Sequence, residues 1–242
     1  MLTVNFNQCG SVLLLSALIL SAASCSRDPA SQPGQSSKAN PPATADFDET
    51  KRKAEQGDAA AQNLLGEMLL KSEGTRTDMK AAAEWFRKSA EQGYASAQFN
   101  LGTLFEAGQG VPFDYGRAVE WYRKSAEQDH AAAQYSLAAM YVYARGVERN
   151  DNEALKWLSK AAQQGDAMAQ YAMGERYRTG TGVPKDLVEA FKWFALAAAQ
   201  KVADAATALD EIKSQMNREQ VAEGRKRAQQ FVSKSPSAST GK

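Results

Sequence analysis

Histidine and cysteine are scarce in this chain of 242 residues, which has one histidine and two cysteines. Both cysteines, Cys9 and Cys25, lie near the N-terminus. The remainder of the chain therefore has no cluster of His and Cys side chains that could hold a zinc ion. The single histidine, His130, also lacks the partner side chains that a catalytic or metal-binding role requires. We expect no metal site.

Neither the net charge nor the motifs of the chain indicate binding of nucleic acids or nucleotides. The chain has 29 Lys and Arg against 28 Asp and Glu, a formal net charge of +1, which is not the basic footprint of a nucleic-acid-binding protein. The stretch "GTGVPKD" is rich in glycine but recurs as a turn, and no phosphate-binding loop pattern occurs. No catalytic constellation is visible. The sequence predicts a protein that is not an enzyme and that binds no cofactor and no nucleic acid.

What the chain has in abundance is repetition. The stretch "EWFRKSAEQG" begins at Glu84, and "EWYRKSAEQD" begins at Glu120, 36 residues later. A longer unit recurs near residues 54–89, 90–125, 126–161 and 162–197. Two residue types keep the same step in every copy: Trp85, Trp121, Trp157 and Trp193, and Gln62, Gln98, Gln134 and Gln170. A fixed period of this length indicates stacked structural repeats.

Each copy has the pattern of two helices. In the second copy, small and apolar residues recur at helical spacing from Ala95 to Phe105 and again from Ala118 to Ala126. Glycines that end helices lie between these stretches, at Gly110, Gly146 and Gly182. Three residues that favour the N-cap, the position directly before a helix, follow these glycines: Asp114, Asn150 and Asp186. Glu153 and Glu189, three residues further on, predict capping boxes in the last two copies. We expect the tryptophans to fill the core between these helices.

These residues resemble the Sel1-like repeat, a relative of the tetratricopeptide repeat. The shared pattern is A-x-A-Q-x-x-L-G-x-x-Y, then G-x-G-V-P-x-D, then A-x-x-W-x-x-K-A, from about Ala54 to Ala198. The resemblance implies an all-α, right-handed superhelix (solenoid) of about four helix-turn-helix repeats that binds proteins. Some members staple each repeat with two cysteines, whereas no repeat here contains one.

The array needs a cap at each end. We expect the array and its caps to cover residues 46–232, ending in a charged helix within "NREQVAEGRKRAQQFV", and we expect a disordered tail over residues 233–242.

The first 45 residues differ from the array. Val12 to Leu20 form an apolar run too short to span a bilayer, which is typical of a signal peptide. The stretch Ala22-Ala23-Ser24-Cys25 resembles the lipobox of bacterial lipoproteins, which implies a signal peptide over residues 1–24 and a lipid on Cys25. The alternative is cleavage after Ala23, giving a soluble periplasmic or secreted protein. Ser26 resembles the sorting pattern of outer-membrane lipoproteins. Residues 25–45 read as a flexible tether rich in Ser and Pro.

Positions that differ among the copies are free to contact a partner. One such stripe on the first helices predicts a groove for a protein or peptide, with these candidate residues: Asn100, Thr103, Ser136, Tyr143, Glu175 and Thr179. By resemblance to tetratricopeptide arrays, this stripe lines the concave face. We therefore expect an envelope-anchored scaffold that binds the membrane through its N-terminal lipid. The alternative is a soluble exported regulator or a targeting module of an enzyme that acts on the cell wall.

Overall fold

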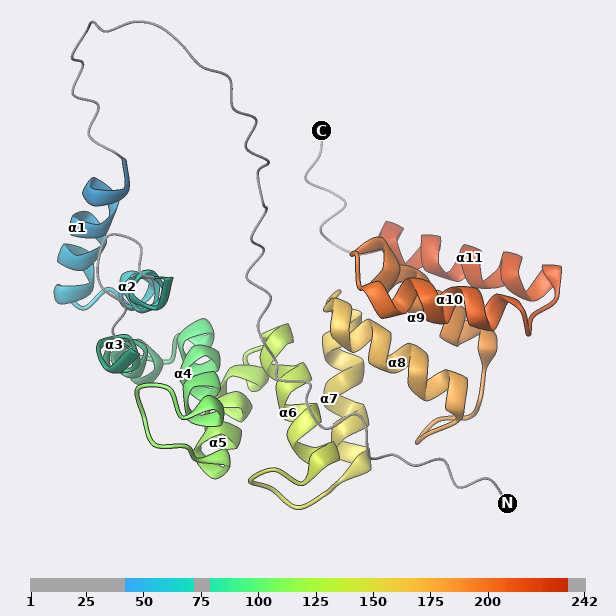
Figure 1. The fold of residues 1–242 in the computed structure, drawn as a ribbon, viewed down its shortest axis with the longest axis horizontal. Helices are drawn as coiled ribbons and strands as arrows, with labels where there is room; N and C mark the ends of the chain where they lie inside the picture. Colours follow the sequence, from blue (N-terminus) through green and yellow to red (C-terminus); the bar gives the residue numbers. More distant parts are fainter. Residues whose placement is uncertain (1–41, 72–78, 235–242) are drawn as a thin grey trace, which may run out of the picture. The chain divides into compact units, whose positions relative to one another are not determined.

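Eleven α-helices make up the part of the chain that the structure, a computed structural model, describes: residues 42–71 and 79–234 (Figure 1). The first five are α1 (Pro42–Glu55), α2 (Ala59–Lys71), α3 (Met79–Glu91), α4 (Ala95–Ala107) and α5 (Tyr115–Glu127). The other six are α6 (Ala131–Tyr143), α7 (Asp151–Gln163), α8 (Ala167–Thr179), α9 (Leu187–Ala199), α10 (Ala203–Lys213) and α11 (Arg218–Lys234). The predicted signal peptide, Cys25 and most of the predicted tether and tail lie outside the described residues.

From α1 to α10, each helix packs against the next one in the chain, and α11 returns to pack on α9. The even-numbered helices from α2 to α8 are the first helices of four repeats, and α3, α5, α7 and α9 are the second helices. The described residues thus form an all-α solenoid, as the sequence predicts. The helical region is slightly longer than expected: α1 begins at Pro42, where a proline is well accommodated at the first helical position, and α11 ends at Lys234.

In three of the four repeats, an aromatic ring from the second helix packs against a glycine of the first helix. A Cβ placed on Gly102 would lie 2.7 Å from the ring of Tyr122, and Gly66 and Gly174 meet Phe86 and Phe194 in the same way. All three rings are almost fully buried. The third repeat has Ala138 where the others have glycine, and its facing position holds the smaller Leu158. Each of these rings therefore requires a glycine opposite it, because the ring occupies the space that the Cβ of another residue would take.

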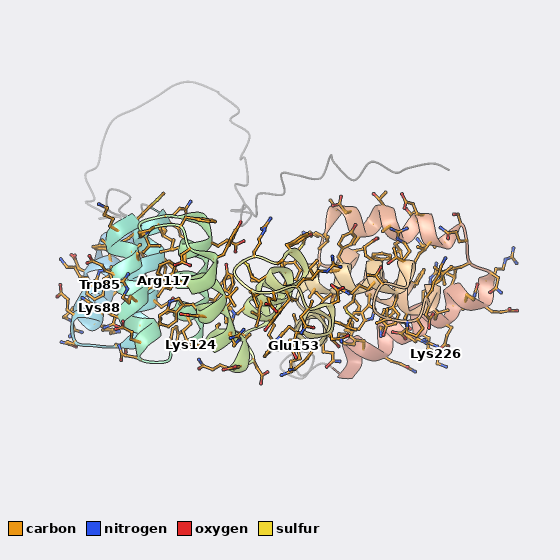
Figure 2. All side chains as sticks on the ribbon, turned by 90° about the horizontal axis from the view of Figure 1, so that it is seen from below. Trp85, Lys88, Arg117, Lys124, Glu153 and Lys226 are labelled. Carbon is orange, nitrogen blue, oxygen red and sulfur yellow. The ribbon has the colours of Figure 1, made fainter. Side chains whose placement is uncertain are left out.

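The tryptophans play a smaller part than the sequence predicts. Trp157 and Trp193 are buried, with 7% and 5% of their surface exposed, but Trp85 and Trp121 are only partly buried. Lys88 lies beside Trp85 (Figure 2), with its Nζ 4.0 Å from the centre of the tryptophan ring. The Nζ of Lys124 lies 4.2 Å from the ring centre of Trp121. The prediction that every tryptophan fills the core is therefore wrong for the first two copies. In each repeat, the residue directly after the tryptophan points into the core.

The periodic glutamines form a ladder of buried amides. Gln134, which is fully buried, donates from Nε2 to the carbonyl of Ala126 at 3.1 Å and accepts at Oε1 from Gln164 at 2.8 Å. The same two bonds recur at Gln62, Gln98 and Gln170, which accept from Gln92, Gln128 and Gln200. A buried amide with both groups bonded avoids the cost of an unpaired polar group. The regular glutamines thus have a structural role.

The turns between first and second helices press against the preceding repeat. Gly110 has a φ of 70°, and a Cβ on it would lie 2.0 Å from the carbonyl oxygen of Met79 at the start of α3. Gly146 lies in the same way against Tyr115 at the start of α5. Only glycine combines a positive φ with so close an approach.

The predicted helix caps are confirmed, but the capping boxes are wrong. The side chains of Asp114, Asn150 and Asp186 each accept a backbone N–H of their own helix. The backbone N–H groups of these same residues donate to carbonyls of the preceding first helix, at Phe105, Tyr141 and Tyr177. Because that donor is already used, the carboxylates of Glu153 and Glu189 pair with Lys156 and Lys192 instead.

Candidate functional site

The six predicted groove residues all lie on the first helices α4, α6 and α8, but they do not form one exposed surface. The amide of Asn100 donates to Asn63 Oδ1 at 2.9 Å and to Glu67 Oε1 at 3.2 Å, both on α2. Ser136, at the matched position of the next repeat, is only 9% exposed. Asn100 therefore faces the neighbouring first helix, and Ser136 is buried, so neither side chain lies on an open groove surface.

The two threonines use their hydroxyls within their own helices. Thr103 donates to the carbonyl of Asn100 at 2.7 Å, and Thr179 donates to the carbonyl of Glu175 at 2.8 Å. Thr103 is half-buried, whereas Thr179 is exposed. Neither threonine therefore offers an uncommitted hydroxyl hydrogen to a ligand.

Glu175 lines a shallow cleft between α8 and α10. The cleft has a volume of about 290 Å³ and is lined by Tyr171, Glu175, Arg178, Asp204, Thr207, Ala208 and Glu211. The only cation of the lining, Arg178, is bound to Glu175, with 2.6 Å between Nη2 and Oε2. Burial, together with the charges of Glu175 and Asp204, raises the pKa of Tyr171. With three carboxylates and one guanidinium, the cleft is acidic.

A second surface surrounds Tyr143, at the C-terminal end of α6. We call it the aromatic–arginine cluster: Phe113, Tyr115, Tyr143 and Arg145. Phe113 and Tyr143 are 58% and 65% exposed. The rings of Phe113 and Tyr115 meet edge to face with 4.6 Å between their centres. The guanidinium of Arg145 lies 5.6 Å from the ring centre of Tyr115 and 5.2 Å from that of Tyr143, so it links the two rings.

The turn after α6 explains how these residues meet. Ala144 ends the helix in the left-handed conformation, with a φ of 53°, and Arg145 donates its backbone N–H to the carbonyl of Met140. Gly146 then lies against the backbone of Tyr115, so Arg145 is brought to the start of α5. Glu106 of α4 holds the guanidinium in an ion pair of 3.6 Å and accepts the hydroxyl of Tyr122 at 2.7 Å. The cluster is therefore fixed by two repeats.

Sequence reasoning found Tyr143 but missed its neighbours. Phe113 had a partial signal in the sequence, because it is an apolar residue at a turn position that holds Arg149 and Lys185 in the next two copies. The contribution of Arg145 could not be predicted from the sequence, since its contact with Tyr115 depends on how the turn of one repeat packs on another.

Two further properties bear on function. In residues 42–71 and 79–234, no three His, Cys, Asp or Glu side chains come together as a metal site would require. Within the same ranges, every helix is too short or too polar to cross a membrane.

The Sel1 repeat family model matches residues 59–94, 95–130, 131–166 and 167–202, which is more than half of the chain. The chain belongs to the Sel1 repeat family. These Sel1 repeats start five residues later than the units read from the sequence, because each begins with the first helix. A repeating pattern has no unique starting point, so the two frames describe the same helix pairs.

Solved structures of other Sel1-repeat proteins resemble this one. A protective antigen of uropathogenic Escherichia coli, with 36% identity and a TM-score of 0.67, covers 76% of this chain, which spans only 40% of that protein. A Sel1 repeat protein from Oxalobacter formigenes has 31% identity, a TM-score of 0.63, and coverage of 77% of this chain and 80% of its own. An immunity protein from Pseudomonas aeruginosa, at 20% identity and a TM-score of 0.52 over 81% of this chain and 76% of its own, shares the fold alone. No curated protein sequence matches the chain.

Proposed function

We propose that this Sel1-repeat protein is a non-enzymatic scaffold, anchored in a bacterial envelope, that binds a segment of another protein. Sel1-repeat proteins are generally protein-interaction scaffolds. The observation that carries the proposal here is the aromatic–arginine cluster. Tyrosine and arginine dominate the residues that contribute most to protein interfaces, and Tyr143 and Phe113 are the most exposed large apolar side chains of the described residues.

The cluster is suited to binding because it is already ordered. Arg145 is held between two rings and by Glu106, so it loses little side-chain freedom when a partner docks. Its charge is balanced by Glu106, and that of nearby Arg117 by Asp114 at 3.5 Å. Rigid aromatic surface with little net charge favours a partner segment with apolar side chains.

The envelope location rests on the sequence before the array. Cys25 lies in a stretch that resembles a lipobox, and the preceding apolar run is that of a signal peptide. The name of the Escherichia coli relative, a protective antigen, supports a place accessible from outside the cell. The lipid would hold the array near the membrane while the aromatic–arginine cluster remains accessible to a partner.

The anchor leads to a direct prediction. Replacing Cys25 by alanine should move the protein from the membrane fraction to the soluble envelope fraction, because the acyl chains are lost. Intact mass of the purified wild-type protein checks the chemistry, since a lipoprotein begins at Cys25 and carries added acyl mass. An unacylated N-terminus at Ser24 would contradict the lipid anchor and support cleavage after Ala23.

The binding surface leads to a second prediction. A partner should first be captured from envelope extract with the full mature protein and then titrated against the double variant Phe113→Ala, Tyr143→Ala. We expect affinity to fall at least thirtyfold, about 2 kcal/mol, because both exposed anchors are lost. Both side chains are mostly solvent-exposed, so the melting temperature should stay close to that of the wild type.

Tyr94→Ala is the matched control, since Tyr94 is an exposed aromatic residue outside the cluster, at 37% exposure. This variant should bind as the wild type does. If the double variant binds normally while Asp204→Asn, Glu211→Gln does not, the acidic cleft between α8 and α10 is the binding site instead.

A further inference from the structure

His130 caps the start of α6. Its Nδ1 accepts the backbone N–H of Ala133 at 3.3 Å, and its backbone is extended, with a φ of −75° and a ψ of 107°. The imidazole also stacks on Phe99 of α4, with 5.1 Å between ring centres and 28° between the planes. One side chain thus both ends the turn between α5 and α6 and contacts the first helix of the preceding repeat.

The equivalent caps in two other repeats are aspartates. Asp58 and Asp166 each accept a backbone N–H, from Ala61 and Ala169, at 2.8 Å. A carboxylate keeps this ability at neutral and mildly acidic pH. An imidazole accepts at Nδ1 only while that nitrogen is unprotonated, and histidine gains its proton in the range between pH 5 and 8. The third repeat therefore has a cap that depends on pH where these two do not.

The charged groups around His130 oppose each other. Burial lowers the pKa of the imidazole from its ordinary value of 6.5, while the carboxylate of Asp166, at the start of α8, acts to raise it. Asp129, on the chain directly before His130, accepts the amide of Gln134 at 3.3 Å. From α4, the packed group is the uncharged ring of Phe99. Burial is the larger influence, so the folded protein favours the neutral imidazole.

We propose that His130 makes the joint between the second and third repeats sensitive to pH, because the start of α6 is held only while the imidazole is neutral. In the unfolded chain the imidazole binds a proton at a higher pH than in the folded one. The stability from the neutral cap is therefore complete above about pH 6.5 and declines as the pH falls below that value. The pKa of Asp166 shifts in the opposite direction. Burial raises this pKa above 3.8, so the contribution of Asp166 to folding stability decreases as the pH rises from about 3.8.

The chain has only this one histidine, which makes the test specific. The imidazole proton signals of the full mature protein should be followed by NMR from pH 8 to pH 4.5, and we expect a pKa below 6.5. Amide hydrogen exchange at Ala133 and Gln134, whose N–H groups are bonded to His130, should be corrected for the intrinsic effect of pH. It should show about fivefold less protection at pH 5 than at pH 7.5, the size of a typical lost cap.

His130→Asn is the matched control, since the asparagine oxygen can cap the helix at either pH. In this variant protection of the same amides should not change between pH 5 and pH 7.5, and any effect of Asp166 remains in both proteins. A pKa at or above 6.5 in the wild-type protein overturns the proposal. So does an equal loss of protection in wild type and variant, or none in the wild type.

Discussion

Replacing Tyr122 by alanine should lower the free energy of unfolding by about 3–5 kcal/mol, whereas the same change at the neighbouring Trp121 should cost only about 1–2 kcal/mol. Tyr122 is 1% exposed and fills the space left by Gly102, so its removal opens a cavity between α4 and α5. It also removes the hydroxyl that donates to Glu106 at 2.7 Å. Trp121 is partly exposed already, and Lys124 covers its ring.

Urea unfolding followed by circular dichroism would measure both changes. Because repeats are stabilised mainly by their neighbours, Tyr122→Ala is also expected to broaden the transition as the central repeats unfold first. A greater loss for Trp121→Ala than for Tyr122→Ala would show that the tryptophan, and not the residue after it, forms the core.

The sequence predicts the fold well because the pattern of one helix pair occurs in it four times. The glycines at the turns and the capping residues Asp114, Asn150 and Asp186 mark helix boundaries that the structure confirms. The sequence could not tell which of two adjacent aromatic residues points inward. Trp121 and Tyr122 are both large and lie next to each other, about 100° apart around a helix, so either fits an apolar face at this spacing. The glycine opposite Tyr122 decides the matter, and that contact lies 20 residues away in the sequence.

The candidate site was less predictable. Variation among copies singled out Asn100 and Ser136, which occupy the position that Leu64 has in the first repeat, but a variable position need not be exposed. Leu64 is 43% exposed in the first repeat, whereas Ser136 is 9% exposed in the third, because inner repeats have a neighbour on each side. The aromatic–arginine cluster could not be predicted from the sequence, for a different reason. Arg145 reaches Tyr115 only because Gly146 of one repeat lies against the backbone of another.

The pairing of glycine with a ring leads to the last prediction. Gly102→Ala should destabilise the protein by about 2–3 kcal/mol, since the new methyl group would lie 2.7 Å from a ring that has no room to move. Gly116→Ala is the matched control, because the nearest atom is 3.2 Å away and belongs to the side chain of Asp114. There the change should be neutral or stabilise α5 by up to about 1 kcal/mol.

Tyr122→Leu should rescue Gly102→Ala, because the double variant recreates the pairing of Ala138 with Leu158 in the third repeat, where both residues are buried. Tyr122→Leu alone should be destabilising, since it leaves a gap beside Gly102. We expect the double variant to be more stable than the sum of the two single changes predicts, by at least 1 kcal/mol, as measured in a double-mutant cycle by urea unfolding. Strict additivity would mean that the ring and the glycine do not constrain each other, and the rule that links them across the four repeats would then be wrong.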